Sequence, residues 1–352
     1  MKSAFVLSCA LAFFLGAQAP SFAVPVDAAR LLADAPAETL DAYHLFTDAA
    51  GRVPNEGVVP YAVNTPLFSD YAEKFRYVFI PPGEQAKYTA QGVLDFPVGT
   101  TLVKVFAYPA DFRKPDDKVR LIETRLMIRK ADGWTPLAYV WNGGKAELKR
   151  AGKRVKVDFI DTSGAAQSIN YGVPNANQCK ECHSLSNAVT PIGPKARNLN
   201  GDFAYSTGVE NQLAHWTRIG ILTGAPDPAA APRLPRWDDP AAPLDARAKA
   251  YLDVNCGHCH NPKGLASNSG LFLTYEEENP SARGILKRPV AAGRGSGGLL
   301  YAIMPGHPEQ SILLYRMQST EPGVMMPQIG RTMTHKEAVK LIGDYIASLP
   351  AE

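Results

Sequence analysis

Five stretches in the first half of the chain are rich in the β-branched and aromatic residues typical of strands. The stretches are residues 75–80, 101–107, 119–129, 136–141 and 155–160. In the third stretch Ile122, Thr124, Leu126 and Ile128 share one side, and Leu121, Glu123, Arg125 and Met127 share the other, mixed side. Turn signals such as Pro81-Pro82-Gly83 separate the stretches. Residues 24–172 therefore predict an antiparallel β-sandwich.

Helical spacing replaces this strand-like pattern in the second half of the chain. Helices are predicted at residues 211–222, 246–254 and 308–318, and a last helix has apolar positions at Val339, Leu341, Ile342, Tyr345, Ile346 and Leu349. Thr334 and Glu337 have the spacing of a capping box at the start of that helix. Residues 225–244 contain six prolines and predict a semi-rigid linker, or a loop wrapped on the protein surface.

Composition adds two constraints to this picture. The chain of 352 residues is 45% hydrophobic and 20% charged, so it can bury cores and is not a disordered tail. Its 37 basic and 34 acidic residues give a net charge of +3, which provides no electrostatic reason to expect nucleic acid as a partner.

The first 23 residues have the pattern of a secretory signal peptide. Lys2 precedes an apolar stretch at residues 4–16, and Ser21-Phe22-Ala23 fits the small-x-small cleavage rule, so a mature chain starting at Val24 is expected. No later window is apolar enough to predict a membrane span. We therefore expect a periplasmic or otherwise exported protein.

The cysteines carry the most specific chemical signal. Cys9 belongs to the predicted leader, and the other four cysteines fall in two copies of one pattern, Cys179-Lys180-Glu181-Cys182-His183 and Cys256-Gly257-His258-Cys259-His260. C-x-x-C-H is the attachment signature of c-type haem, in which two thiols bind the porphyrin and the His becomes the proximal iron ligand. A zinc ribbon would place its cysteine pairs closer together, and a thioredoxin-type site explains neither histidine. The sequence therefore predicts two covalently attached haem c groups.

The region around the second motif resembles class I cytochrome c over residues 245–350. The shared features are a helix leading into the motif, Met326-Pro327 in a following loop, and a terminal helix. The resemblance implies that His260 and Met326 are the axial iron ligands. Met325 and then Met304 are the alternative sulfur ligands.

The first motif has a less complete setting. Gly193-Pro194 follows it, and by analogy with class I cytochromes the Pro194 carbonyl either accepts the His183 ring proton or belongs to a plain turn. No Met lies between His183 and Cys256. The sixth ligand of the first haem is therefore His215, on a predicted helix face turned to solvent, or one of Met127, His44 and Lys195, or the position is open.

The whole mature chain resembles exported di-haem c-type cytochromes with a β-rich N-terminal region of unassigned function. The residues that carry this resemblance are the two motifs together with residues 65–72, 123–126, 139–142, 193–195 and 211–213. The expected fold class is α+β and multidomain: the β-sandwich (24–172), a small, mainly α first haem module (173–224), the proline-rich linker (225–244), and a class I-like, mainly α second module (245–352).

This organisation favours a periplasmic electron carrier, a non-enzyme whose partners are redox proteins. One alternative is a di-haem peroxidase or oxidase with an open first haem. Another is a haem-bearing binding protein that docks a partner through the β domain.

Overall fold

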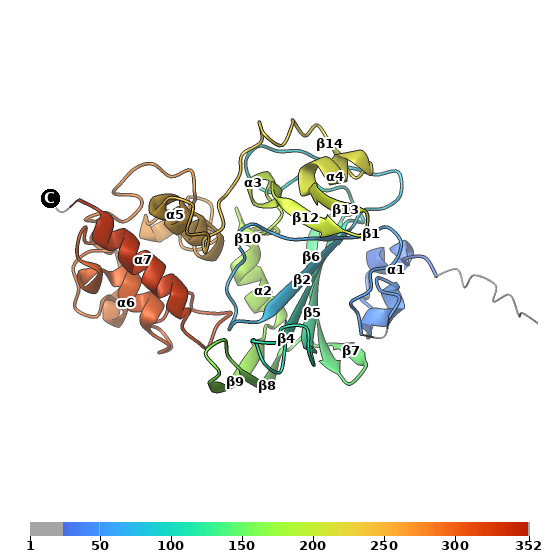
Figure 1. The fold of residues 1–352 in the computed structure, drawn as a ribbon, viewed down its shortest axis with the longest axis horizontal. Coiled ribbons are helices and arrows are strands. Elements are labelled where there is room, and N and C mark those ends of the chain that lie inside the picture. Colours follow the sequence, from blue (N-terminus) through green and yellow to red (C-terminus); the bar gives the residue numbers. More distant parts are fainter. Residues whose placement is uncertain (1–23, 49, 351–352) are drawn as a thin grey trace, which may run out of the picture.

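The computed structural model describes residues 24–48 and 50–350, so the predicted leader at residues 1–23 lies outside the described residues. Its centre is a six-stranded antiparallel sheet in the order β1-β2-β4-β5-β6-β7 (Figure 1). The strands are β1 (Val58–Tyr61), β2 (Glu73–Phe79), β4 (Thr101–Tyr108), β5 (Arg120–Lys130), β6 (Gly133–Asn142) and β7 (Lys145–Leu148). The strands predicted at residues 75–80, 101–107, 119–129 and 136–141 are confirmed, since each of these regions forms a strand of this sheet.

The N-terminal residues cover one face of this sheet. Helix α1 (Ala28–Leu32) and the 3₁₀ turn η1 (Leu40–Tyr43) pack over a core that contains Val105, Leu126 and Tyr139. The Tyr43 and Tyr139 hydroxyls are 3.0 Å apart. Because the side-chain period of a strand is two, burial of these residues directs their neighbours in sequence to the opposite face.

The opposite face of the sheet supports the segment that carries the first cysteine motif. The hairpin of β8 (Lys153–Ile160) and β9 (Ala166–Val173) packs Phe159 and Tyr171 against Phe106 of the sheet. Helix α2 (Ala176–His183) follows and lies between the sheet and the C-terminal helices (Figure 1). The sheet therefore forms a wall beside the first motif.

Residues 184–224 consist of short elements that share a core with the sheet. They are the hairpins β10 (Ser184–Leu185) with β11 (Ala188–Val189) and β12 (Asp202–Tyr205) with β13 (Gly208–Asn211), the helices α3 (Ala196–Leu199) and α4 (Gln212–Arg218), and β14 (Leu222–Thr223). Strand β14 pairs in parallel with β3 (Ala86–Lys87). Leu199, Leu213 and Trp216 are fully buried in one cluster with Val78 and Leu102 of the sheet.

The C-terminal part packs three helices around one core. These are α5 (Leu244–Asn255), α6 (Ile312–Gln318) and α7 (Lys336–Ser348), with Leu252, Leu314, Ile342 and Ile346 in the shared core. The 3₁₀ turns η2 (Ser267–Ser269), η3 (Gly293–Ser296) and η4 (Pro308–Gln310) interrupt the loops. The predicted capping box at α7 does not form, because the Thr334 hydroxyl donates to the Gln318 carbonyl and His335 is the N-cap.

The proline-rich segment is wrapped on the protein surface. Asn64 donates to the Leu234 carbonyl at 3.0 Å, and Thr65 donates to the Pro235 carbonyl at 2.9 Å. Side chains thus satisfy carbonyls that no sheet or helix pairs. None of the helices in the described part of the chain is long and apolar enough to cross a lipid bilayer.

The predicted fold class, a β-sandwich followed by two mainly α cytochrome c-type modules, is wrong. The described residues are built on a six-stranded antiparallel sheet and are only about 21% helix, so they do not form α-rich cytochrome c modules. The front part has a two-stranded hairpin, β8 with β9, where a sandwich would have a second large sheet. The mainly α prediction failed because long loops rich in glycine and proline separate short helices.

Candidate haem-binding site

The first cysteine motif lies on a capped helix. The Asn175 side chain accepts a bond from the Gln178 amide at 2.9 Å, and the Gln178 side chain accepts one from the Asn175 amide at 3.0 Å, so α2 begins with a full capping box. Cys179 and Cys182 lie three positions apart on this helix, and His183 is its last residue. Helical spacing thus places the two thiols and the imidazole on neighbouring parts of one surface.

The second motif follows directly after α5. The Cys259 and His260 amides both donate to the Cys256 carbonyl, at 3.1 and 2.9 Å. A Cβ atom on Gly257 would lie 2.7 Å from the Asp253 carbonyl oxygen, closer than a side chain tolerates. The turn that forms this motif therefore requires glycine at its second position.

None of the four cysteines in the described residues forms a disulfide. Burial raises the pKa of Cys182 to about 12, with the nearby Cys259 thiol adding to the effect, and it raises the pKa of Cys256 to about 12 as well. Such thiols stay protonated at neutral pH, unlike the activated thiolate of a dithiol oxidoreductase. This environment disfavours the thioredoxin-type interpretation.

Both motif histidines have one ring nitrogen committed to the backbone. His183 Nδ1 lies 2.9 Å from the Thr190 carbonyl oxygen, and His260 Nδ1 lies 3.2 Å from that of Leu271. A proton on Nδ1 leaves Nε2 as the nitrogen able to bind a metal, as is usual for histidine ligands. Of the two alternatives for Pro194, the acceptor of the His183 ring proton is not observed, because the Thr190 carbonyl takes that place and the Pro194 carbonyl accepts the Leu94 amide.

The two motifs lie side by side in the folded chain. The segments that follow them are joined, because the Ser186 amide donates to the Lys263 carbonyl at 2.9 Å and Leu185 forms an antiparallel bridge with Gly264. Both motifs contribute to the lining of one cavity of about 760 Å³, Cys179, Cys182 and His183 from the first and Cys256 and His258 from the second. Cys259 and His260 are not part of that lining. Cofactor-sized ligands occupy pockets of roughly 300–1,000 Å³, so this volume suits a large prosthetic group.

Met326 also faces this cavity, together with Met325, whereas Met304 does not line it. The guanidinium of the buried Arg331 fixes the loop by donating to the Met326 carbonyl at 2.9 Å and to the Ser319 carbonyl at 2.8 Å. The Met326 amide donates to the Arg316 carbonyl at 3.0 Å. The backbone of the predicted sulfur ligand is therefore held at both its N–H and its C=O.

His215 lies elsewhere in the molecule. Its Nδ1 is 2.7 Å from a Glu210 carboxylate oxygen, and its ring stacks on Tyr205 with the centroids 3.5 Å apart. It is 7% exposed, contrary to the predicted solvent-facing position, and it does not line the cavity. Of the other residues considered for the first iron, Met127 lines the cavity, and His44 and Lys195 do not.

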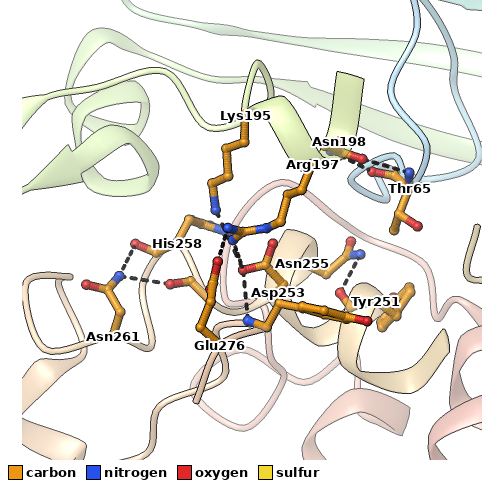
Figure 2. Close-up of polar contacts among 12 residues, drawn as sticks. Thr65, Lys195, Arg197, Asn198, Tyr251, Asp253, Asn255, His258, Asn261 and Glu276 are labelled. Carbon is orange, nitrogen blue, oxygen red and sulfur yellow. Dashed lines mark hydrogen bonds and ion pairs between the residues drawn. The ribbon is translucent and has the colours of Figure 1, made fainter. Parts of the chain in front are cut away.

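A buried ion pair joins the segment after the first motif to the helix that leads into the second (Figure 2). Arg197 on α3 donates to Asp253 on α5 at 2.8 Å, and the side chains are 5% and 1% exposed. Arg197 also pairs with Glu276, and the Lys195 ammonium lies 3.6 Å from Asp253. Because Asp253 is three residues before Cys256, this cluster fixes one motif relative to the other.

The loop at residues 65–72 connects the sheet to both motif regions, a role that was not predicted from the sequence. The Thr65 amide donates to the Asn198 side chain at 2.9 Å, and the Phe68 amide donates to the Asn255 side chain at 2.8 Å. The carboxylate of Asp70 accepts bonds from the Thr332 and Met333 amides. These contacts join segments far apart in the sequence, so only the folded chain reveals them.

The residues present fit two c-type haems better than a zinc site. The part of the chain that the structure describes has no group of three or more His, Cys, Asp or Glu side chains placed to hold one metal ion. A structural zinc site needs four such ligands together, whereas each c-type haem takes one histidine from its motif. Each motif has two thiols three positions apart and an imidazole held at Nδ1, which is compatible with covalent haem attachment; of the second motif only Cys256 and His258 line the cavity.

Neither the family models nor the curated proteins and solved structures compared with this chain gave a match.

Proposed function

We propose that the chain is an exported di-haem c-type cytochrome that carries electrons between redox partner proteins. The observation that carries the proposal is the meeting of two C-x-x-C-H motifs at one cavity, with a backbone hydrogen bond joining the segments that follow them. Haem groups attached at both motifs would lie in one region of the protein, which suits a carrier that passes electrons between them. The haem supplies the redox chemistry, and the protein supplies attachment, ligands and burial.

The roles of the residues follow from their positions. Cys179 with Cys182, and Cys256 with Cys259, would each hold one porphyrin through thioether bonds. His183 and His260 are the proposed proximal ligands, because a backbone carbonyl holds each ring at Nδ1. These two carbonyls then orient the rings and increase the basicity of Nε2.

Met326 is the proposed sixth ligand of the second haem. Its support is its place in the cavity lining together with Cys256 of the second motif, and the anchoring of its backbone by Arg331. A Met/His ligand pair raises the potential of a haem relative to one without Met. With Met326 on the second haem only, the pair would have unequal potentials, and electrons would move preferentially towards the second haem.

Ligand-binding spectra separate a carrier from an enzyme. The mature protein, with both haems reduced, would be mixed with CO, and the oxidised protein with cyanide. A carrier with two six-coordinate irons should show little or slow spectral change. Rapid, saturable binding at one iron would contradict the carrier and favour the peroxidase or oxidase alternative.

A further inference from the structure

Three basic side chains form a row across the cavity-facing side of the sheet. Arg76 on β2 is directly opposite Lys104 on β4, and Lys104 is directly opposite Arg125 on β5. All three line the cavity that both motifs share. Like charges at directly opposite positions destabilise a sheet. The arrangement therefore needs a compensating interaction.

Acidic side chains supply only part of that compensation. Arg125 pairs with the fully buried Glu123 through two contacts of 2.9 and 2.5 Å, and the Tyr171 hydroxyl donates to the same carboxylate. Lys104 faces the ring of Phe106, with its ammonium 4.9 Å from the ring centroid. Within the described residues neither Arg76 nor Lys104 has an ion-pair partner. The row thus contains two more basic side chains than its one carboxylate can pair with.

Burial makes these two cations costly. It lowers the pKa of Lys104 well below its usual value, and the charges of Arg76, Lys74 and Arg125 lower it further. Burial likewise lowers the pKa of Arg76. A charge removed from water without a partner is strongly unfavourable. An anion in the cavity would remove this penalty, because it would pair with both side chains.

We propose that Arg76 and Lys104 form an oxyanion site in the cavity, shaped for a carboxylate-sized group. The inference rests on the proposed di-haem function, since the ligand source it favours is a propionate carboxylate of the first haem. A free small oxyanion that enters the cavity is the other source of the same chemistry.

The order of the row favours the propionate. The strand order is β2-β4-β5-β6, and α2, which carries Cys179 and Cys182, contacts β6. Arg76 is therefore the cation of the row farthest from the attachment cysteines. A haem carries its propionates on the side of the ring away from the vinyl groups that react with the thiols. A porphyrin attached at α2 and extending along the row would present its propionates towards Arg76.

The test compares Lys104→Met and Arg76→Met with the control Lys156→Met in the mature protein. Lys156 is on β8, 75% exposed and outside the cavity lining. The haem content of each protein is measured first by the pyridine haemochrome method. Each haem potential is then measured against pH, and the same proteins are titrated with formate as a free carboxylate probe.

If the ligand is the propionate, both cavity variants should lower the potential of one haem and change its pH dependence. Formate should then have no effect. Loss of a nearby positive charge stabilises the oxidised iron, which is the reason for the direction. Lys104→Arg, which keeps the charge, should restore the wild-type curve. If the ligand is instead a free oxyanion, formate should bind saturably, and each cavity variant should weaken that binding by roughly tenfold or more.

A protein with two haems that shows neither effect beyond the control would overturn the oxyanion site and leave the proposed function standing. A protein without haem would refute the proposed function itself. In that protein the thermal unfolding midpoint still decides the oxyanion site. The oxyanion site predicts that formate raises this midpoint and that Lys104→Met abolishes the rise. Any other result refutes the site.

Discussion

Single side chains at the cavity differ in how firmly the fold holds them. The His183 and His260 rings are fixed by backbone carbonyls, and the Met326 backbone is fixed by Arg331. Groups held in this way lose little entropy on binding a metal, because their orientation is set before it arrives. Substitutions of these single residues therefore test directly whether each one is an iron ligand.

Replacing the proposed sulfur ligand tests the second iron. Met326→Ala should lower the potential of one haem sharply, within the roughly 0.8 V range that axial ligands set. The physical reason is that the thioether favours reduced iron. Spectroelectrochemical titration of the mature protein would measure the shift.

Met304→Ala is the matched control, because Met304 also precedes a proline but does not line the cavity. Its two potentials should match those of the unmodified protein. Unchanged potentials in Met326→Ala would show that another group binds the second iron.

His335 should make stability depend on pH. It is 12% exposed and stacked on Phe68, and burial lowers its pKa to about 4, opposed by the charge of Glu337. The unfolded chain, with an ordinary histidine pKa of about 6.5, binds the proton first as pH falls. Stability is then complete above about pH 6.5 and declines between there and pH 4, by about 3 kcal/mol from this residue.

Urea unfolding at about pH 7 and pH 5 would measure this decline. His335→Phe should reduce the difference between the two pH values. His307→Phe, at a site that is 45% exposed, should leave it in place. An equal pH dependence in His335→Phe and in the unmodified protein would refute the assignment.

At the scale of elements, contacts between distant segments determine the site. The ion pair between Arg197 on α3 and Asp253 on α5 connects the two motif regions. Arg197→Met should destabilise the protein by about 3 kcal/mol, because the buried Asp253 carboxylate loses its closest cation and keeps only the Lys195 ammonium at 3.6 Å. The free energy of urea unfolding would measure this loss.

A surface pair supplies the control for this prediction. Arg236 and Asp238 are also 2.8 Å apart, but they are 65% and 42% exposed. Arg236→Met should change the unfolding free energy by less than about 1 kcal/mol. Equal losses in the two variants would mean that the buried pair has no special role.

The sequence predicted elements well where one pattern marks one buried face. The strands at residues 101–107 and 119–129 are examples, since Val105, Leu126 and Ile128 lie in the core under α1. Ile122, which was predicted on the same side as Leu126, instead packs on the opposite face, because a bulge between β4 and β5 shifts the register. It could not predict strand register, so the alignment of Arg76 with Lys104 and Arg125 stayed hidden. Register depends on long-range packing rather than on local spacing.

The mixed side of strand β5 shows the same limit. Glu123 and Met127 belong to the side that the sequence shows as mixed, but both are buried. Tyr171 of β9 covers Glu123, and residues of α3 and α4 pack in one cluster with Met127. Thr65 and Asp70 read as parts of a loop without a role, yet their partners are in the α3 and α7 regions. Tertiary contacts override local pattern at these positions.

At the scale of the whole molecule, the sheet and the first motif region share one core. Leu199, Leu213 and Trp216 are at most 1% exposed, and they pack in one cluster with residues of the sheet. A chain reduced to residues 173–352 would expose this apolar surface. We expect it to be insoluble when produced alone, because large exposed apolar patches promote aggregation.

Soluble yield and haem content would be compared with those of the chain 24–352 produced in the same host. A soluble, monomeric 173–352 chain carrying both haems would contradict the view that the sheet is part of the site. It would instead favour a separate front domain.

The central claim is that each C-x-x-C-H motif binds one haem covalently. The most direct test is a pyridine haemochrome assay, combined with intact mass, on protein matured in a host that attaches c-type haem. We predict two haems per chain, falling to one in Cys182→Ala or in Cys259→Ala. A chain of apoprotein mass with no haemochrome signal would contradict the account.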